Sequence, residues 1–185
     1  MSGVKFSPDG KLLASSAWDK TVFVRNISDW SLKYNLKGHT NSIIGLDFNK
    51  TGEVLVSYAG NNSVSAADNS LIFWDVKTGN QLCQVKDHES GITKGFFDLD
   101  ADYVFSCSDD GTVKITDYKK KKTIATYVAI GDDEFMIFTP DNYYMASRKA
   151  LKSISFRING ALVPFEQFDI YLNRPDIVAK EIGKS

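Results

Sequence analysis

A repeat period of about 42 residues is the feature that most constrains the fold of this chain. Four phenylalanines, each closing a short apolar stretch, mark the period: Phe6, Phe48, Phe97 and Phe138. Their spacings are 42, 49 and 41 residues, and the longest interval contains a polar insertion of seven residues, 61–67. Such a period, in a chain rich in β-branched and aromatic residues, is typical of repeats that each form one small sheet.

Each repeat contains four short stretches of alternating or continuous apolar residues, which predict four β-strands. Turn-forming Pro, Asp and Gly residues separate the first two stretches, as at Pro8-Asp9-Gly10. We therefore predict an all-β fold with no helix before residue 173. It comprises about four four-stranded antiparallel sheets over residues 1–166, followed by a C-terminal tail, 167–185. The four sheets are expected at 3–37, 38–86, 87–129 and 130–166.

Two dipeptides make the repeat pattern specific. Gly38-His39 stands nine residues before Phe48, and Trp74-Asp75 ends the third strand of the same repeat. Residues 3 to about 165 resemble the WD-repeat β-propellers in this spacing. The other repeats have different residues at the equivalent positions. These are Asp87-His88 and Thr116-Asp117 in the third repeat, Arg25-Asn26 in the first and Arg157-Ile158 in the fourth. The resemblance implies a segment of a β-propeller, a rigid frame whose loops are presented to protein partners.

The resemblance also implies a buried hydrogen-bond network in each repeat, formed by a His, a Ser, an Asp and the Trp. Carried over by position, the network of the second repeat comprises His39, Ser57, Asp68 and Trp74, and that of the third His88, Ser106 and Asp110. The first repeat keeps Ser15 and Asp19 but has no histidine. A buried carboxylate needs donors, and His and Ser can supply them.

The start of the repeat pattern raises the question of how the sheets are covered. A histidine nine residues before Phe6 would precede Met1, so the chain is expected to begin at the innermost strand of its first blade. An open arc of blades would expose flat apolar faces, which favour association. Three arrangements stay open: part of a longer propeller, which we favour, a ring closed by two chains through these faces, and a closed ring of four blades.

The tail carries a second resemblance. The string Asn173-Arg174-Pro175-Asp176-Ile177-Val178, within 164–183 and together with 139–147, is similar to the junction between WD repeats and a caspase-like peptidase domain in bacterial fusion proteins. It implies, as an alternative function, the regulatory portion of a peptidase whose catalytic domain lies outside this chain. Pro175 suits the first turn of a helix, with Asp176 near its positive end. We expect a short helix at about 175–182, docked through Ile177, Val178 and Ile182.

Composition and the remaining motifs argue against chemistry in this chain. Its 22 Lys and Arg balance 23 Asp and Glu, which disfavours nucleic-acid binding, and no apolar run suits a membrane span. Cys83 and Cys107 lie within predicted strands, and we expect them to be inert thiols in a reducing, cytoplasmic compartment. We predict a non-catalytic scaffold with protein partners and without cofactor or metal.

Four polar segments each have a structural and a functional interpretation. The run 119–122 of four lysines is predicted to be an exposed hairpin turn, with nucleic-acid binding as the alternative. Asp98, Asp100 and Asp102 lack the glycine and glutamate of a calcium loop and read as a solvated turn. The acidic segment 132–134 is predicted to be a loop between blades, or else a binding rim. The insertion 61–67 could contact a partner.

Overall fold

A computed structural model describes residues 2–60, 68–99, 103–153, 155–158, 161–164 and 169–183. The insertion 61–67, Asp100 and Asp102 lie outside the described residues. The chain forms two compact units. Unit 1 comprises residues up to Asp110 together with Thr116–Lys122, and unit 2 comprises Gly111–Ile115 and the chain from Thr123 onward.

Short strands make up most of the described chain. The strands of the first two repeats are β1 (Gly3–Phe6), β2 (Leu12–Ser16), β3 (Thr21–Asn26), β4 (Leu32–Lys37), β5 (Ile43–Phe48), β6 (Val54–Ala59), β7 (Leu71–Asp75) and β8 (Gln81–Val85). Those that follow are β9 (Ile92–Phe97), β10 (Tyr103–Ser108), β11 (Thr112–Asp117), β12 (Lys122–Ile130), β13 (Glu134–Phe138), β14 (Tyr144–Ala146), β15 (Ser155–Ile158) and β16 (Ala161–Pro164). The helices are α1 (Ala150–Ser153), α2 (Asp169–Leu172) and α3 (Pro175–Glu181).

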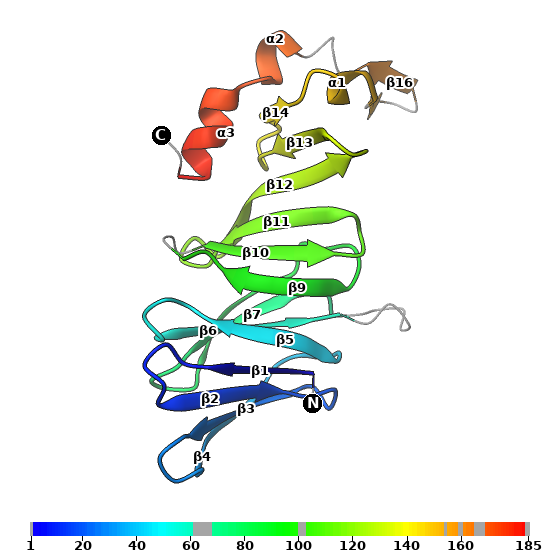
Figure 1. Cartoon of the computed structure of the whole chain (residues 1–185). Coiled ribbons are helices and arrows are strands. Elements are labelled where there is room, and N and C mark those ends of the chain that lie inside the picture. Colours follow the sequence, from blue (N-terminus) through cyan, green and yellow to red (C-terminus); the bar gives the residue numbers. More distant parts are fainter. Residues whose placement is uncertain are drawn as a thin grey trace. The chain divides into compact units, whose positions relative to one another are not determined.

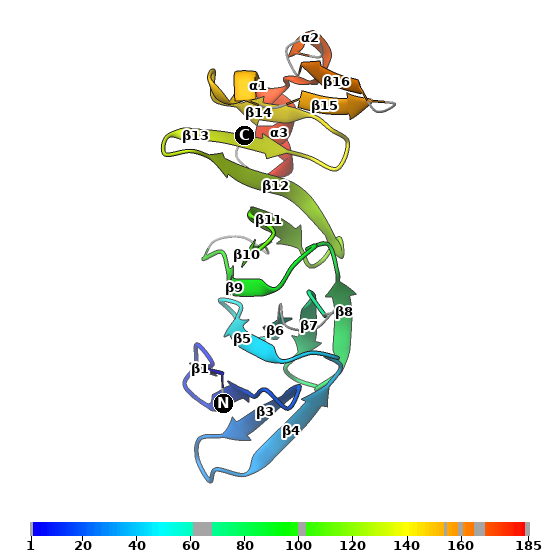
Figure 2. The ribbon, with the colours of Figure 1, turned by 90° about the vertical axis from the view of Figure 1, so that its right-hand side faces the viewer.

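The first two repeats each fold into a four-stranded antiparallel meander, here called blade 1 (β1–β4) and blade 2 (β5–β8) (Figure 1). Corresponding pairs set the register, Phe6 opposite Leu13 in blade 1 and Phe48 opposite Leu55 in blade 2. Within unit 1, the inner strands β1, β5 and β9 follow one another along one edge, while β4 and β8 lie along the other (Figure 2). The sheets confirm the predicted all-β fold class.

Apolar layers between successive sheets hold unit 1 together. One layer joins blade 1 to blade 2 and consists of Ala14, Val22, Val24, Leu36, Ile43, Leu46, Phe48, Leu55, Ile72, Trp74 and Val76. The next layer joins blade 2 to the β9–β10 hairpin and consists of Val54, Val56, Tyr58, Leu71, Phe73, Val85, Ile92, Phe97 and Val104. Since strand side chains alternate between faces, blade 2 contributes one set of residues to each layer. Each blade therefore depends on its neighbours for burial.

The region predicted as the fourth blade pairs differently from blades 1 and 2. Strand β12 runs for nine residues and pairs with β13, which pairs with β14, while β15 and β16 form a separate two-stranded sheet. The cause is the connection at 131–133, a three-residue turn in which Gly131 has a φ of 68°. So short a turn makes β12 and β13 antiparallel neighbours. The segment 132–134, expected between blades, thus belongs to a hairpin.

The C-terminal tail is anchored on β14 in unit 2. The buried Tyr144 hydroxyl donates to Asp169 Oδ1 at 2.7 Å, and the Arg174 backbone N–H donates to the Tyr144 carbonyl at 2.9 Å. Helix α3 starts at Pro175, close to the predicted start, and buries Val178 completely while Ile177 and Ile182 are half-buried. Two single-turn helices, α1 and α2, precede residue 173, where none was expected.

We expect Gly60→Ala to destabilise unit 1, because a Cβ there would lie 2.4 Å from the Ile92 backbone nitrogen and 2.7 Å from the Gly91 Cα. Backbone atoms cannot move aside as a flexible side chain can, so the cost should be about 1–3 kcal/mol. Urea unfolding would measure it. Gly10→Ala is the matched control, since its Cβ meets open space and only its positive φ of 71° is strained. An effect no larger than that of Gly10→Ala would contradict the packing explanation.

Candidate functional site

The residues predicted as the network of the second repeat come together inside blade 2. His39, in the loop before β5, lies with Nδ1 2.8 Å from Asp68 Oδ2 and Nε2 2.8 Å from the Ser57 hydroxyl. The Trp74 indole N–H donates to the same Ser57 oxygen at 2.8 Å. The backbone N–H of Thr40 donates to Asp68 Oδ2, also at 2.8 Å. The network ties the incoming loop to strands β6 and β7.

This arrangement resembles a Ser-His-Asp catalytic triad in geometry, but solvent does not reach it. The Ser57 side chain is 0% and Asp68 1% exposed, so no substrate carbonyl can reach the hydroxyl. The Ser57 oxygen accepts from Trp74 and lies against His39 Nε2, while His39 Nδ1 lies against Asp68. Both ring nitrogens of His39 are thus engaged within the network. The geometry therefore supports a structural role.

Asp68 is the charged centre of the network. Burial alone would raise the pKa of its carboxyl, but hydrogen bonds from His39, Ser70 and the Thr40 backbone outweigh burial and hold the pKa at about 2. The ionised form is therefore favoured in the folded chain relative to the unfolded chain. Because the pKa is lowered by folding, Asp68 contributes stability above pH 4 that is lost as the pH falls toward 2.

The third repeat builds the same network without the tryptophan. His88 lies with Nδ1 2.8 Å from Asp110 Oδ2 and Nε2 2.9 Å from the Ser106 hydroxyl. The buried Thr116 stands at the position of Trp74. The two histidines of the chain are thus both engaged in structural networks.

A different residue, Asp47, joins three successive repeats at the inner edge of unit 1. Its Oδ1 lies 2.9 Å from Lys5 Nζ of β1, and its Oδ2 accepts the backbone N–H of Phe97 in β9 at 3.0 Å. The Asp47 side chain is largely buried, whereas Lys5 is half-exposed. One carboxylate therefore connects all three inner strands of unit 1.

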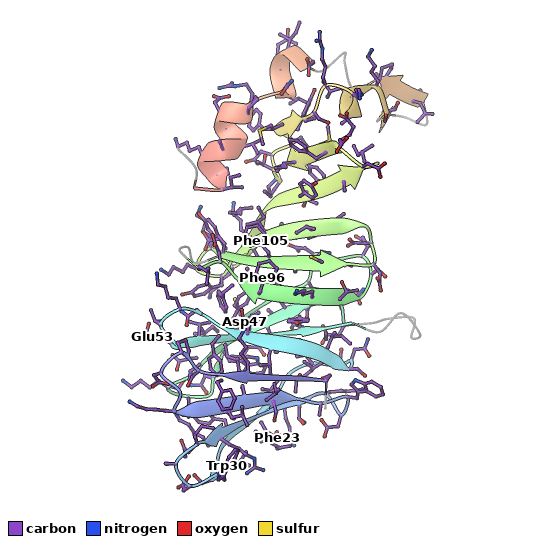
Figure 3. All side chains as sticks on the ribbon, in the orientation of Figure 1. Phe23, Trp30, Asp47, Glu53, Phe96 and Phe105 are labelled. Carbon is purple, nitrogen blue, oxygen red and sulfur yellow. The ribbon has the colours of Figure 1, made fainter. Side chains whose placement is uncertain are left out.

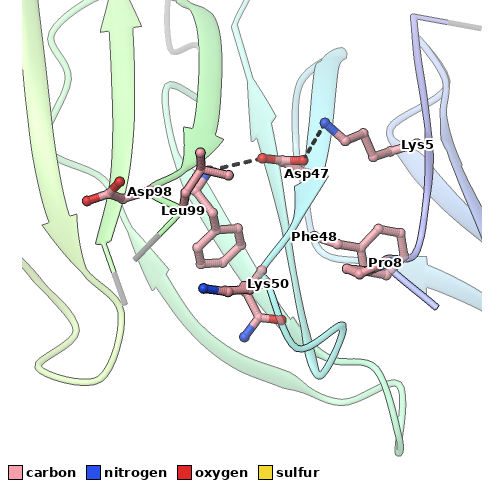
Figure 4. Close-up of a pocket in the computed structure, with 9 residues that line it drawn as sticks. Lys5, Pro8, Asp47, Phe48, Lys50, Asp98 and Leu99 are labelled. Atoms are coloured by element: carbon pink, nitrogen blue, oxygen red, sulfur yellow. Dashed lines mark hydrogen bonds and ion pairs between the residues drawn. The ribbon is translucent and has the colours of Figure 1, made fainter. Parts of the chain in front are cut away.

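A pocket of about 520 Å³ opens beside Asp47, where the three inner strands turn toward their second strands (Figure 4). Phe48 and Phe97 supply buried aromatic surface, and Leu99 is 78% exposed at the margin. The lining residues are Lys5, Pro8, Asp47, Phe48, Asn49, Lys50, Phe97, Asp98 and Leu99. The pocket therefore combines two cations, two carboxylates and apolar surface, and one cation and one carboxylate, Lys5 and Asp47, are paired with each other.

This pocket is the feature that sequence reasoning missed. The signal was present, because Lys5 and Asp47 occupy the same repeat position, directly before the marker phenylalanine, with opposite charges. Adjacent inner strands bring equivalent repeat positions together. An alignment of the repeats with one another would therefore have indicated the ion pair between Lys5 and Asp47. Asp98, considered above only as part of an acidic turn, is a lining residue.

The remaining sequence motifs have ordinary surroundings. Cys83 and Cys107 are free and half-buried in β8 and β10, and burial raises the pKa of the Cys83 thiol. The lysine run occupies the exposed turn into β12, where Lys120 Nζ lies 3.6 Å from Asp117. None of the helices in the described part of the chain has the length and apolar character needed to cross a bilayer.

Stacked meanders joined by buried His–Ser–Asp networks define a β-propeller repeat protein. The sequence matches the WD domain, G-beta repeat family over residues 1–26, 30–75 and 79–117. The chain belongs to this family.

Several curated proteins and solved structures are similar to the chain. Protein HIR1 of Candida albicans is 27% identical over 137 residues, covering 65% of this chain and 14% of HIR1. Eukaryotic translation initiation factor 3 subunit I of Schizosaccharomyces pombe is 38% identical over 82 residues, 44% of this chain and 23% of that protein. The structure of U3-55K superposes with a TM-score of 0.61 at 15% identity, covering 78% of this chain and 47% of that one, which shows the fold alone. The chain spans less than a quarter of both curated relatives.

We expect Asp68→Asn to lower the free energy of unfolding by roughly 2 kcal/mol at pH 7, the worth of a carboxyl pKa held near 2 against its ordinary 3.8. The difference from wild type should shrink as the pH falls from 5 toward 2, because protonation removes the same charge. Urea unfolding between pH 3 and 7 measures the loss of stability at pH 7 and its dependence on pH. The exposed Asp87→Asn is the control, and a difference that does not change with pH would contradict the assignment.

We expect Asp47→Ala to destabilise unit 1 by about 1–3 kcal/mol, because the Phe97 N–H loses its acceptor in a buried position. Lys5→Ala removes only the half-exposed cation and should cost below about 1 kcal/mol. Hydrogen exchange at the Phe97 amide distinguishes the two variants, since only Asp47→Ala should accelerate this exchange. Equal exchange in both variants would mean that Asp47 does not hold this amide.

Proposed function

We propose that the chain is a non-catalytic scaffold that binds protein partners as extended peptide segments in the pocket beside Asp47. The pocket is the observation that carries this proposal, because it combines buried aromatic surface with charged groups at its rim. Successive sheets anchored by buried networks give it a rigid frame, and a rigid site loses little entropy on binding. Membership in the WD family is consistent with protein interaction.

The lining residues define the kind of segment that fits. The exposed Leu99, next to the largely buried Phe48 and Phe97, can contact an apolar side chain of the peptide. Lys50 and Asp98 offer charges of both signs at the same pocket, so charged residues on either side of the apolar one would be matched. Recognition would then depend on one apolar anchor and its charged neighbours.

Selection of random 12-residue peptides displayed on phage, with the full chain immobilised, tests this function. We expect enriched peptides to lose at least about tenfold in affinity on Leu99→Asp, because a charge would replace the exposed apolar side chain that the anchor residue of the peptide would contact. Leu162→Asp, at an exposed leucine of unit 2, is the matched control. Failure to enrich any peptide, or equal binding to both variants, would refute the proposal.

The finer predictions of the sequence stay predictions. Membership in a longer propeller is one of them, and the chain spans 14% of HIR1 and 23% of the initiation factor subunit. The alternative, a regulatory part of a caspase-like peptidase of bacterial origin, depends on the tail string, which lies anchored on β14. The reading frame beyond Ser185 decides it, since a Cys- and His-bearing domain would follow. The relatives named above are eukaryotic.

A further inference from the structure

The turn after each marker phenylalanine uses its first side chain in the same way in blades 1 and 2. Ser7 Oγ accepts the backbone N–H of Leu12 at 2.9 Å, and Asn49 Oδ1 accepts that of Val54 at 3.0 Å. Both side chains are buried. Each polar group is thus engaged by its own turn, which it ties to the start of the second strand of the blade.

The third repeat departs from this pattern at Asp98. The backbone of its turn is closed as in the other two, since the Asp98 N–H donates to the Tyr103 carbonyl at 2.9 Å. The Asp98 carboxylate, however, has neither a hydrogen bond nor an ion pair with any residue that the structure describes. It is half-buried and lines the pocket beside Asp47 (Figure 4). A carboxylate in this position is available to a ligand.

The other charged groups of the pocket are already engaged. Asp47 lies on β5, between β1 and β9 (Figure 3), and bonds Lys5 at 2.9 Å and the Phe97 N–H at 3.0 Å. Lys50 takes part in an interaction of its own. Among the described charged residues that line the pocket, Asp98 is therefore the one whose charged group has no partner.

The energetic cost of covering Asp98 selects the occupant. Any segment that fills the pocket removes water from this carboxylate, and an ionised group that loses water without gaining a partner is strongly unfavourable. A cationic side chain replaces the lost water with a charge-assisted hydrogen bond, whereas an acidic one adds repulsion. The exposed Leu99, next in the chain, offers apolar contact beside the charge.

We infer that the pocket selects segments with a basic residue, which pairs with Asp98, and an apolar residue, which contacts Leu99. This inference rests on the proposed function and narrows it to one class of segment. Residues i and i+2 of an extended segment point to the same side, so this spacing directs both side chains into the pocket. Arginine is favoured over lysine, because its planar fork can bond both carboxylate oxygens.

Titration of the full 185-residue chain with short blocked peptides tests the inference. The peptide used is acetyl-Ala-Arg-Ala-Leu-Ala-amide, and two matched peptides carry Gln or Glu in place of Arg. In two-dimensional amide NMR spectra, the signals of Asp98 and Leu99 report binding in the pocket, and their shifts give the affinity. Asp98→Asn keeps the shape of the side chain and removes its charge. Asp87→Asn, at an exposed aspartate in the loop before β9, is the matched control.

We expect the arginine peptide to bind the wild-type chain roughly fivefold to tenfold more tightly than the glutamine peptide, with the glutamate peptide weakest. Asp98→Asn should abolish this preference, and Asp87→Asn should retain it. Equal affinities of the arginine and glutamine peptides for the wild-type chain would overturn the inference. A preference that survives Asp98→Asn, or shifts confined to residues outside the pocket, would overturn it as well.

Failure of this inference is separable from failure of the proposed function. Peptides that are enriched on the full chain and lose affinity on Leu99→Asp, yet contain no basic residue, would overturn the inference and leave the proposed function intact. If no peptide is enriched, the proposed function fails. Absence of shifts at Asp98 and Leu99 with all three blocked peptides would then remove the inference with it.

Discussion

Burial of one sheet face against the next is the interaction on which unit 1 depends. A four-stranded meander of short strands cannot cover its own apolar faces, so each blade is stable only as part of a stack. Blade 2 meets this requirement on both faces, and its central strands β6 and β7 are buried almost throughout. Blade 1 meets it on one face only. The two blades are alike in register and differ in exposure, so the comparison shows how much burial a blade gains from each adjacent sheet.

Polar groups fix how the blades stack, because an apolar layer by itself tolerates sliding. The network of His39, Ser57 and Asp68 ties the loop leaving one blade to the strands of the next, and Asp47 ties three inner strands at their ends. Each of these groups is buried and each has its partners, so a shift in register would leave a charge or a donor unsatisfied. The pocket beside Asp47 is a consequence, since the same contacts hold the three strand ends in place around it.

The fold of unit 1 was predictable because local signals and the repeat agree there. Period-two strands, Gly-containing turns and a spacing of 42 residues all indicate the same four-stranded unit, and the network residues follow from their repeat positions. The pairing of the region after Thr123 was not predictable, because a three-residue turn at 131–133 joins β12 to β13 where a loop between blades was expected. The pocket was missed for another reason: it lies between repeats, and reading each repeat along the chain does not compare Lys5 with Asp47.

The first two repeats show how far the polar network depends on a neighbouring sheet. Ser15 and Asp19 stand at the positions of Ser57 and Asp68, but Ser15 is half-buried, Asp19 is exposed, and Thr21 donates to Asp19 through its backbone N–H and its hydroxyl. In blade 2 the equivalent pair is buried, and a loop from the preceding sheet brings His39 between the two side chains. The same serine and aspartate positions therefore form a buried network in one sheet, whereas in the other the aspartate belongs to an exposed turn, and burial against an adjacent sheet decides which of the two forms.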